Sequence, residues 1–87
     1  MNDETLLEFP CSFPIKMMGR DTPEFRQMVR KLVERHTGPV DDAAIHNSLS
    51  RNGRFVSVTI TVSARSQQQL DDIYHDVSAH EDVLMAL

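Results

Sequence analysis

The amino-acid sequence predicts an α+β domain in which strands and helices follow the order β-α-β-β-α-β. Two amphipathic helical segments, residues 22–38 and 66–80, flank a run of strict apolar-polar alternation from Phe55 to Ala64. Shorter strand-like segments precede the first helix, follow it, and come after the second helix. With right-handed crossovers, this order places both helices on one face of a four-stranded antiparallel sheet, which is the ferredoxin-like sandwich.

Size and composition fit one globular domain. The chain has 87 residues, of which 40% are hydrophobic and 25% charged, and a chain of this length builds one modest core. It has no apolar run near the ~20 residues that span a bilayer, an acidic first segment unlike a signal peptide, and one cysteine. We therefore expect a soluble protein of the reducing cytoplasm. The net charge of −4 argues against nucleic-acid partners and anionic membranes.

The first strand is expected within FPCSFPIKMMG, residues 9–19, after a flexible tail of residues 1–8. Residues 9–87 would then form the single domain. Because proline cannot donate a hydrogen bond within a sheet, Pro14 should stand at the start of a strand that runs from Ile15 to Met18. Gly19 would release the backbone for a turn.

The first helix has clear start and stop signals. Thr22 suits the N-cap, Pro23 suits the first helical position, and Gly38 followed by Pro39 ends the helix. Its apolar residues recur at helical spacing along one face: Phe25, Met28, Val29, Leu32, Val33 and His36.

The middle of the sheet is predicted as a hairpin. AAIHNSLS, residues 43–50, alternates as a strand, and Asn52-Gly53 predicts a type I′ turn with positive φ at both positions. The following strand, Phe55 to Ala64, has an apolar face of alternate β-branched residues and a face of serine and threonine.

The second helix and a last strand complete the pattern. Ser66 and Gln69 match a capping box, and VLMAL, residues 83–87, is a plausible strand. The first helix is rich in arginine and lysine, whereas the second carries Asp71, Asp72 and Asp76. Opposite charges favour a side-by-side orientation of the helices, although solvated faces would explain the same residues.

The chain resembles the YbeD-like family of small, uncharacterised bacterial proteins. The resemblance is carried by LLEFPCSFPIKMMG, by TPEF and ERH in the first helix, by the Asn-Gly turn with FVSVTITVSA, and by the final VLMAL. It covers Leu6 to Leu87. The resemblance implies an α/β plait similar to ACT regulatory domains and no particular activity. A loose association of the family with lipoate-attachment genes makes lipoate metabolism a conceivable setting.

No residue pattern indicates a catalytic centre, a metal site or a cofactor. Cys11 lacks a neighbouring base or cation that would lower its pKa, so we interpret it as structural. The four histidines are not spaced to share a helix face, as zinc ligands on a helix would be. RNA recognition on this fold uses aromatic residues on the central strands, whereas the exposed face of the third strand has one aromatic, Phe55, at its end.

The candidate ligand-binding residues are Gly19, Arg20, Asp21 and Thr22, which join the first strand to a helix N-terminus. Helix N-termini attract anions, and the resemblance to ACT domains implies amino-acid binding near this loop, where a glycine permits close approach. Arg20 would pair with the carboxylate of such a ligand. The negative charge of Asp21 and the missing N–H of Pro23 argue against an anion site at this position. A small-molecule sensor of this kind predicts that Gly19→Val or Arg20→Ala abolishes ligand binding without unfolding the domain.

The main functional hypothesis is a non-enzymatic regulatory or protein-interaction module. It would bind a protein partner or a second copy through a strand edge or through the uncovered sheet face, which should present Lys16 and Met18. The amino-acid or carboxylate sensor is the first alternative. The second is a weak acylphosphatase-like hydrolase using Arg20 or Arg26, although the surrounding motif of that family is missing.

Overall fold

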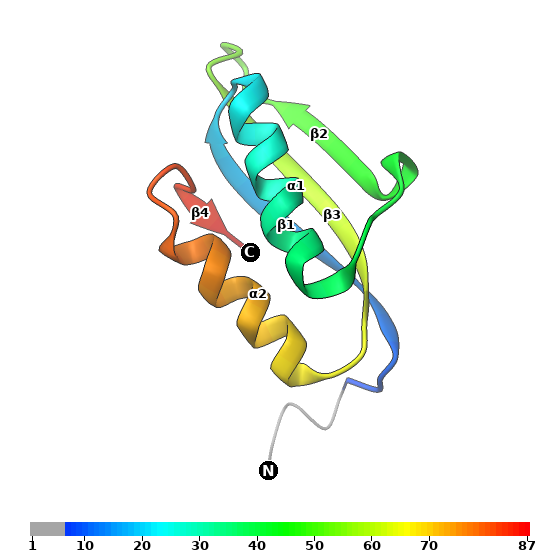
Figure 1. Ribbon diagram of the computed structural model, residues 1–87. Helices are drawn as coiled ribbons and strands as arrows, with labels where there is room; N and C mark the ends of the chain where they lie inside the picture. The colour runs from blue at the N-terminus through cyan, green and yellow to red at the C-terminus, as the bar shows by residue number, and fades with distance from the viewer. Residues whose placement is uncertain (1–6) are drawn as a thin grey trace.

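The computed structural model describes residues 7–87 and confirms the predicted order of elements (Figure 1). The four strands form one antiparallel sheet in the order β2-β3-β1-β4, and both helices lie on the same face of it. Within residues 7–87, no helix has the length and hydropathy needed to cross a membrane. The elements are β1 (Cys11–Arg20), α1 (Pro23–Thr37), the short 3-10 helix η2 (Asp42–Ala44), β2 (Ile45–Leu49), β3 (Phe55–Ala64), α2 (Gln67–Ala79) and β4 (Met85–Ala86).

The core lies between the helices and one face of the sheet. As predicted, alternate residues of β3 from Val56 to Ala64 are buried, and the polar residues between them lie on the other face. The apolar stripe of α1 is buried against them. The remaining buried apolar residues come from β1 and α2: Ile15, Met17, Leu70, Ile73 and Val77.

The first strand is longer than predicted. It begins before Pro14, which lies inside it, opposite Thr61 of β3. Alternate residues of a strand direct their backbone groups to opposite neighbours. Lys16 exchanges both backbone hydrogen bonds with Leu87 (3.0 and 2.8 Å), so Pro14, two residues earlier, also faces the β4 side. β4 itself pairs only with Met17 and Met18. Proline therefore removes no hydrogen bond between β1 and β3.

The prediction that Gly19 makes a turn is wrong. Gly19 lies inside β1, and its φ is not positive. A Cβ atom at this position would stand 2.3 and 2.6 Å from ring carbons of Phe25 and 2.7 Å from the carbonyl oxygen of Asp82. Close packing of α1 and of the segment before β4 on the strand, rather than backbone conformation, thus requires glycine here.

The predicted type I′ turn is also wrong. Gly53 has a positive φ of 74°, but Asn52 does not. The Gly53 amide donates to the Ser50 carbonyl (2.9 Å), and the Ser50 hydroxyl accepts from the Phe55 amide (3.1 Å). The Asn52 side chain accepts from the Arg54 amide (3.1 Å). Because these side chains satisfy loop amides, a longer loop forms in which one glycine supplies the positive φ.

The predicted helix ends are confirmed, with one change in the second cap. Thr22 accepts from the Phe25 amide (3.0 Å), and Gly38 ends α1 with a φ of 79°. Ser66 accepts from the Gln69 amide (3.1 Å), but the Gln69 side chain accepts from the Arg65 amide (2.7 Å) rather than from Ser66.

The last strand is shorter than the predicted residues 83–87. The Val83 amide donates to the His80 carbonyl (3.1 Å) in a turn that leads out of α2. Regular strand pairing with β1 is therefore limited to Met85 and Ala86, although the Leu87 backbone still bonds to Lys16.

Candidate interaction site at the β2 edge

The predicted ligand-binding residues lie together at the end of β1, but their polar groups already have partners. The Asp21 carboxylate accepts from Nε of Arg26 (2.9 Å) and pairs with Nη2 of the same guanidinium (2.8 Å). The Arg20 guanidinium lies 5.8 Å from the centroid of the Phe55 ring. The Thr22 hydroxyl is taken by its role as N-cap. Pro23 has no N–H to offer, so little of this helix end is free for an anion.

A hollow of about 260 Å³ nevertheless lies beside these residues. Arg20 lines it, and so do the acidic residues Glu81 and Asp82 from the turn before β4. Phe25 and Leu84 add apolar surface. The hollow thus combines both signs of charge, which suits a small ligand carrying both charges better than a simple anion.

The two arginines of the hydrolase hypothesis line different hollows. Arg20 belongs to the one just described, whereas Arg26 lines a hollow between α1 and β2 and is paired with Asp21. The structure therefore adds no support for an acyl-phosphate site built from this pair.

β2 forms one edge of the sheet, with unpaired backbone groups along it. The Ser50 amide bonds to the Phe55 carbonyl of the neighbouring strand (2.9 Å). By alternation, the backbone groups of Asn47 and Leu49 then point away from β3. An unpaired edge of this kind is a template for pairing with another strand.

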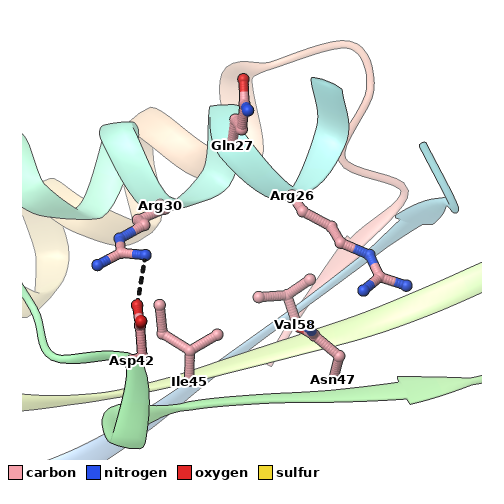
Figure 2. A pocket seen from close by; sticks show the side chains of 7 residues that line it. All are labelled: Arg26, Gln27, Arg30, Asp42, Ile45, Asn47 and Val58. Carbon is pink, nitrogen blue, oxygen red and sulfur yellow. Dashed lines mark hydrogen bonds and ion pairs between the residues drawn. The ribbon is translucent and has the colours of Figure 1, made fainter. Parts of the chain in front are cut away.

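Apolar side chains accompany this edge on the helix face. Leu49 lies opposite the core residue Val56 yet is 56% exposed. A hollow of about 280 Å³ opens between α1 and β2. Figure 2 shows Arg26 and Arg30 pointing from α1 toward β2, with Ile45 and Val58 between them. β2 is therefore less covered by helix than the neighbouring strand β3, as Figure 1 also shows.

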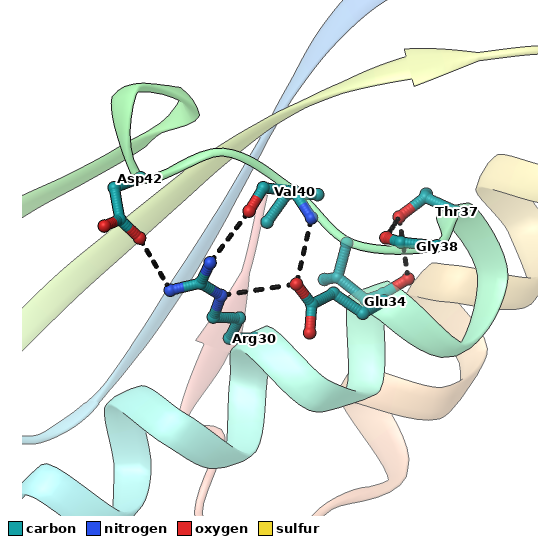
Figure 3. A network of polar contacts seen from close by, with 7 residues as sticks. Arg30, Glu34, Thr37, Gly38, Val40 and Asp42 are labelled. Atoms are coloured by element: carbon teal, nitrogen blue, oxygen red, sulfur yellow. Dashed lines mark hydrogen bonds and ion pairs between the residues drawn. The ribbon is translucent and has the colours of Figure 1, made fainter.

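A polar network holds the segment that leads into β2 (Figure 3). Arg30 donates from Nη1 to Asp42 (2.9 Å), from Nη2 to the Val40 carbonyl (2.8 Å) and from Nε to Glu34 (3.3 Å). Glu34 also accepts from the Val40 amide (2.9 Å). This amide lowers the pKa of Glu34, and the Asp42 carboxylate raises the pKa of Arg30. The network fixes where β2 begins relative to α1.

The two ends of β2 carry opposite charges. Asp41 and Asp42 precede the strand, and the Asp42 side chain is 91% exposed. Arg51 and Arg54 follow it in the exposed hairpin. The sequence predicted pairing through a strand edge but did not identify β2 as that edge, although two aspartates before the strand and two arginines after it were visible in the sequence.

The remaining candidate residues either contact structural partners or have no neighbour that would make them catalytic or metal-binding. Cys11 is a half-buried free thiol opposite Ala64. Nε2 of His36 lies 2.6 Å from a carboxylate oxygen of Asp76, which is the direct polar contact between side chains of α1 and α2. Across residues 7–87, no three His, Cys, Asp or Glu side chains gather in a group that could hold a metal ion. The arginines and lysine of α1 form no ion pair with the aspartates of α2 in this part of the chain.

Together, the sheet order and the two helices define the chain as a ferredoxin-like α+β domain. The solution structure of protein HP0495 from H. pylori shares this fold, with a TM-score of 0.76 and 16% sequence identity over 93% of this chain and 85% of that one. At the sequence level, residues 4–87 match the family described as "Protein of unknown function (DUF493)".

The chain belongs to this DUF493 family, which confirms the resemblance to YbeD-like proteins. The UPF0250 protein NE1487 from Nitrosomonas europaea is 40% identical over 87 residues, which is 100% of both chains. A UPF0250 protein from Paraburkholderia phytofirmans is 40% identical over 85 residues, covering 98% of this chain and 96% of its own.

Proposed function

We propose that the protein is a non-enzymatic interaction module that pairs with a second copy through β2. The observation that carries this proposal is the arrangement along the β2 edge: acidic residues before the strand, arginines after it, and the half-buried Ile45 and exposed Leu49 between them. Such a module would serve a regulatory role of the kind that ACT domains perform.

When two β2 edges pair in antiparallel orientation, each of these features lies opposite a complementary feature of the second copy. With Asn47 at the two-fold axis, the outward backbone groups of Asn47 in the two copies bond to each other. Ile45 then lies opposite Leu49 of the second copy, on the helix face of the joined sheet. Asp41 lies near Arg51 of the second copy, and the symmetric contact repeats at the other end. A two-fold interface requires this kind of self-complementary surface.

The expected dimer is weak. Five residues of edge strand, Ile45–Leu49, make an interface below the ~1,200 Å² typical of stable complexes. Burial of Leu49 against Ile45 and the hollow under α1 supplies the apolar part, and surface ion pairs add about 0–1 kcal/mol each. We therefore expect a dissociation constant of about micromolar or weaker.

Sedimentation velocity over a concentration series tests the proposal. Asn47→Pro removes an N–H that points away from β3, so it should abolish dimerisation and leave the fold intact. Leu49→Lys should weaken the dimer at least about tenfold by placing a charge in the apolar pair. Circular dichroism and heteronuclear NMR spectra check that both variants stay folded.

A charge exchange gives the sharper control. Asp41 makes no side-chain hydrogen bond at the start of η2, so Asp41→Arg should leave the monomer unchanged. Asp41→Arg or Arg51→Asp alone should weaken the dimer, and the two together should restore it, because each new arginine then meets the new aspartate of the other copy. A wild-type protein that stays monomeric at millimolar concentration, or a double variant that remains as weak as the single ones, would refute the proposed pairing.

The hollow beside Arg20 favours a second candidate function, a sensor of a small molecule. Its supporting observation is that Arg20 and the acidic pair Glu81 and Asp82 line the same hollow. An amino acid would place its carboxylate at the arginine and its ammonium group at the acids. NMR titration with pooled amino acids, short acyl acids and lipoate should then shift amides from Gly19 to Glu24 saturably.

For this second candidate, Arg20→Ala should abolish the shifts and Lys31→Ala on α1 should not. Gly19→Val is unsuitable as a test, because its side chain would collide with Phe25 and the Asp82 carbonyl. If no compound shifts these amides, the sensor hypothesis fails, and the proposed pairing through β2 is unaffected.

A further inference from the structure

The strands present no carboxylate side chain on the face of the sheet opposite the helices. None of the four strands, all within the described residues, contains an aspartate or a glutamate, although the chain has a net charge of −4. The acidic residues that the structure describes lie on the helices, in the connecting segments and, for Glu8, before β1. The exposed strand face is made of serine, threonine, methionine and proline, with Lys16 and Arg20 as its fully charged residues and His46 on β2.

This face also has an apolar area where β4 meets β1. Met18 and Met85 lie opposite each other, and Met85 is 51% exposed. Leu87, whose backbone pairs with that of Lys16, is 59% exposed. Methionine side chains are flexible and adapt to the shape of a partner. Lys16 and Arg20 lie on either side of Met18 along β1, so an apolar area is bordered by positive charge.

We propose that the uncovered sheet face binds an acidic amphipathic helix of a partner protein. The apolar stripe of that helix would cover Met18, Met85 and Leu87, and its flanking carboxylates would lie near Lys16 and Arg20. Charge complementarity selects the acidic partner, because the fully charged side chains that the strands present on this face, Lys16 and Arg20, are both positive. The helix would complete a three-layer arrangement in which both faces of the sheet are covered.

Two other occupants fit less well. An extended peptide gains its affinity from main-chain hydrogen bonds, which a sheet offers at its edges and not on its face. Single-stranded RNA needs stacking platforms on the central strands, but Ser57 and Thr59 occupy those positions on β3. Phe55 lies at the end of the strand, and the Arg20 guanidinium covers its ring. Pairing of β2 edges leaves this face open, so the inference is independent of the proposed dimer.

NMR titration with designed peptides tests the inference on the full chain. The probe is a helical peptide of about 18 residues with leucine on one face and glutamate on the others. Lysine in place of glutamate gives a basic control, and a scrambled acidic sequence removes the apolar face at unchanged charge. The acidic amphipathic peptide should bind at least about tenfold more tightly than either control. Its amide shifts should fall on the open-face residues of β1, β3 and β4.

Variants then locate the contact. Lys16→Glu and Arg20→Glu should each weaken binding at least about fivefold, whereas the matched reversal Lys31→Glu on α1 should leave it unchanged. Equal binding of acidic and basic peptides, shifts confined to the helices, or no binding at all would overturn the proposal. An oligouridine that binds the same face more tightly than the acidic peptide would replace it with nucleic-acid recognition.

Discussion

Replacement of Gly19 by alanine is the most direct test of how the first strand, the first helix and the last strand are packed together. The new Cβ would stand 2.3 and 2.6 Å from Phe25 ring carbons and 2.7 Å from the Asp82 carbonyl oxygen. Phe25 is 4% exposed and belongs to the core cluster, so a displacement of its ring disturbs the packing of the core side chains. The Asp82 oxygen belongs to the backbone, so relief there requires the segment before β4 to shift.

The expected cost follows from overpacking of a core. Extra methyl or methylene groups in a well-packed interior cost about 1–3 kcal/mol, and small domains have total stabilities of about 5–15 kcal/mol. We expect Gly19→Ala to lower the free energy of unfolding by an amount in the upper part of the range of about 1–3 kcal/mol. Gly19→Val, with two further methyl groups, should leave little folded protein.

Urea unfolding followed by circular dichroism measures this effect. With an m-value near 1 kcal/mol/M for a chain of this size, the midpoint for Gly19→Ala should fall by about 1–3 M. Gly53→Ala is the matched control, because Gly53 has a φ of 74° but no neighbour within 4 Å of the new Cβ. Its cost should be only the ~1–2 kcal/mol of a left-handed residue. A midpoint for Gly19→Ala within about 0.5 M of wild type would refute the packing argument.

Three further substitutions have expected outcomes. Glu34→Gln should reduce the difference between the free energies of unfolding at pH 7 and at pH 3, as measured by urea unfolding. The lowered pKa of Glu34 means that its stabilisation is present above its ordinary value of 4.5 and is lost as pH falls through the folded-state pKa; an unchanged loss would contradict this. Gln69→Ala should cost about 1–3 kcal/mol, because Gln69 is 8% exposed and bonds two backbone groups. The exposed Gln68→Ala control should cost under about 0.5 kcal/mol, and equal costs would contradict the role of Gln69. Tyr74→Phe removes the hydroxyl that donates to the Leu87 carbonyl (2.8 Å) and should speed amide exchange of Leu87; unchanged exchange would show that this bond does not hold the segment.

The sequence predicted the elements well because their signals are local. The alternation of β3 and the apolar stripe of α1 each follow from which residues must be buried, and the caps at Thr22 and Gly38 follow from unpaired backbone groups at helix ends. The longer β1 could not be foreseen, since the tolerance of Pro14 depends on how far β4 extends beside it. The requirement for Gly19 likewise depends on the close approach of Phe25 and Asp82. No sequence pattern links either residue to Gly19.

The candidate sites also combine features that have a local sequence signal with features that depend on contacts between distant residues. The residues Gly19 to Thr22 are adjacent in sequence. The sequence placed Thr22 correctly at the helix start, whereas Gly19 and Arg20 belong to β1. It did not show that Asp21 pairs with Arg26, or that Glu81 and Asp82, which follow the end of α2, line the same hollow as Arg20. The β2 edge was weakly signalled, because whether a strand lies at an edge depends on the order of the whole sheet.

Net charge was a poor guide to the surface, because the fold separates the two signs of charge. An overall value of −4 suggests an acidic surface, yet every aspartate and glutamate among the described residues lies outside the strands, so the fully charged side chains of the strands on the uncovered sheet face are positive. The β2 edge has a similar separation along one strand, with Asp41 at one end and Arg51 at the other. In both places the arrangement of charge, and not its sum, determines which partner the surface can attract.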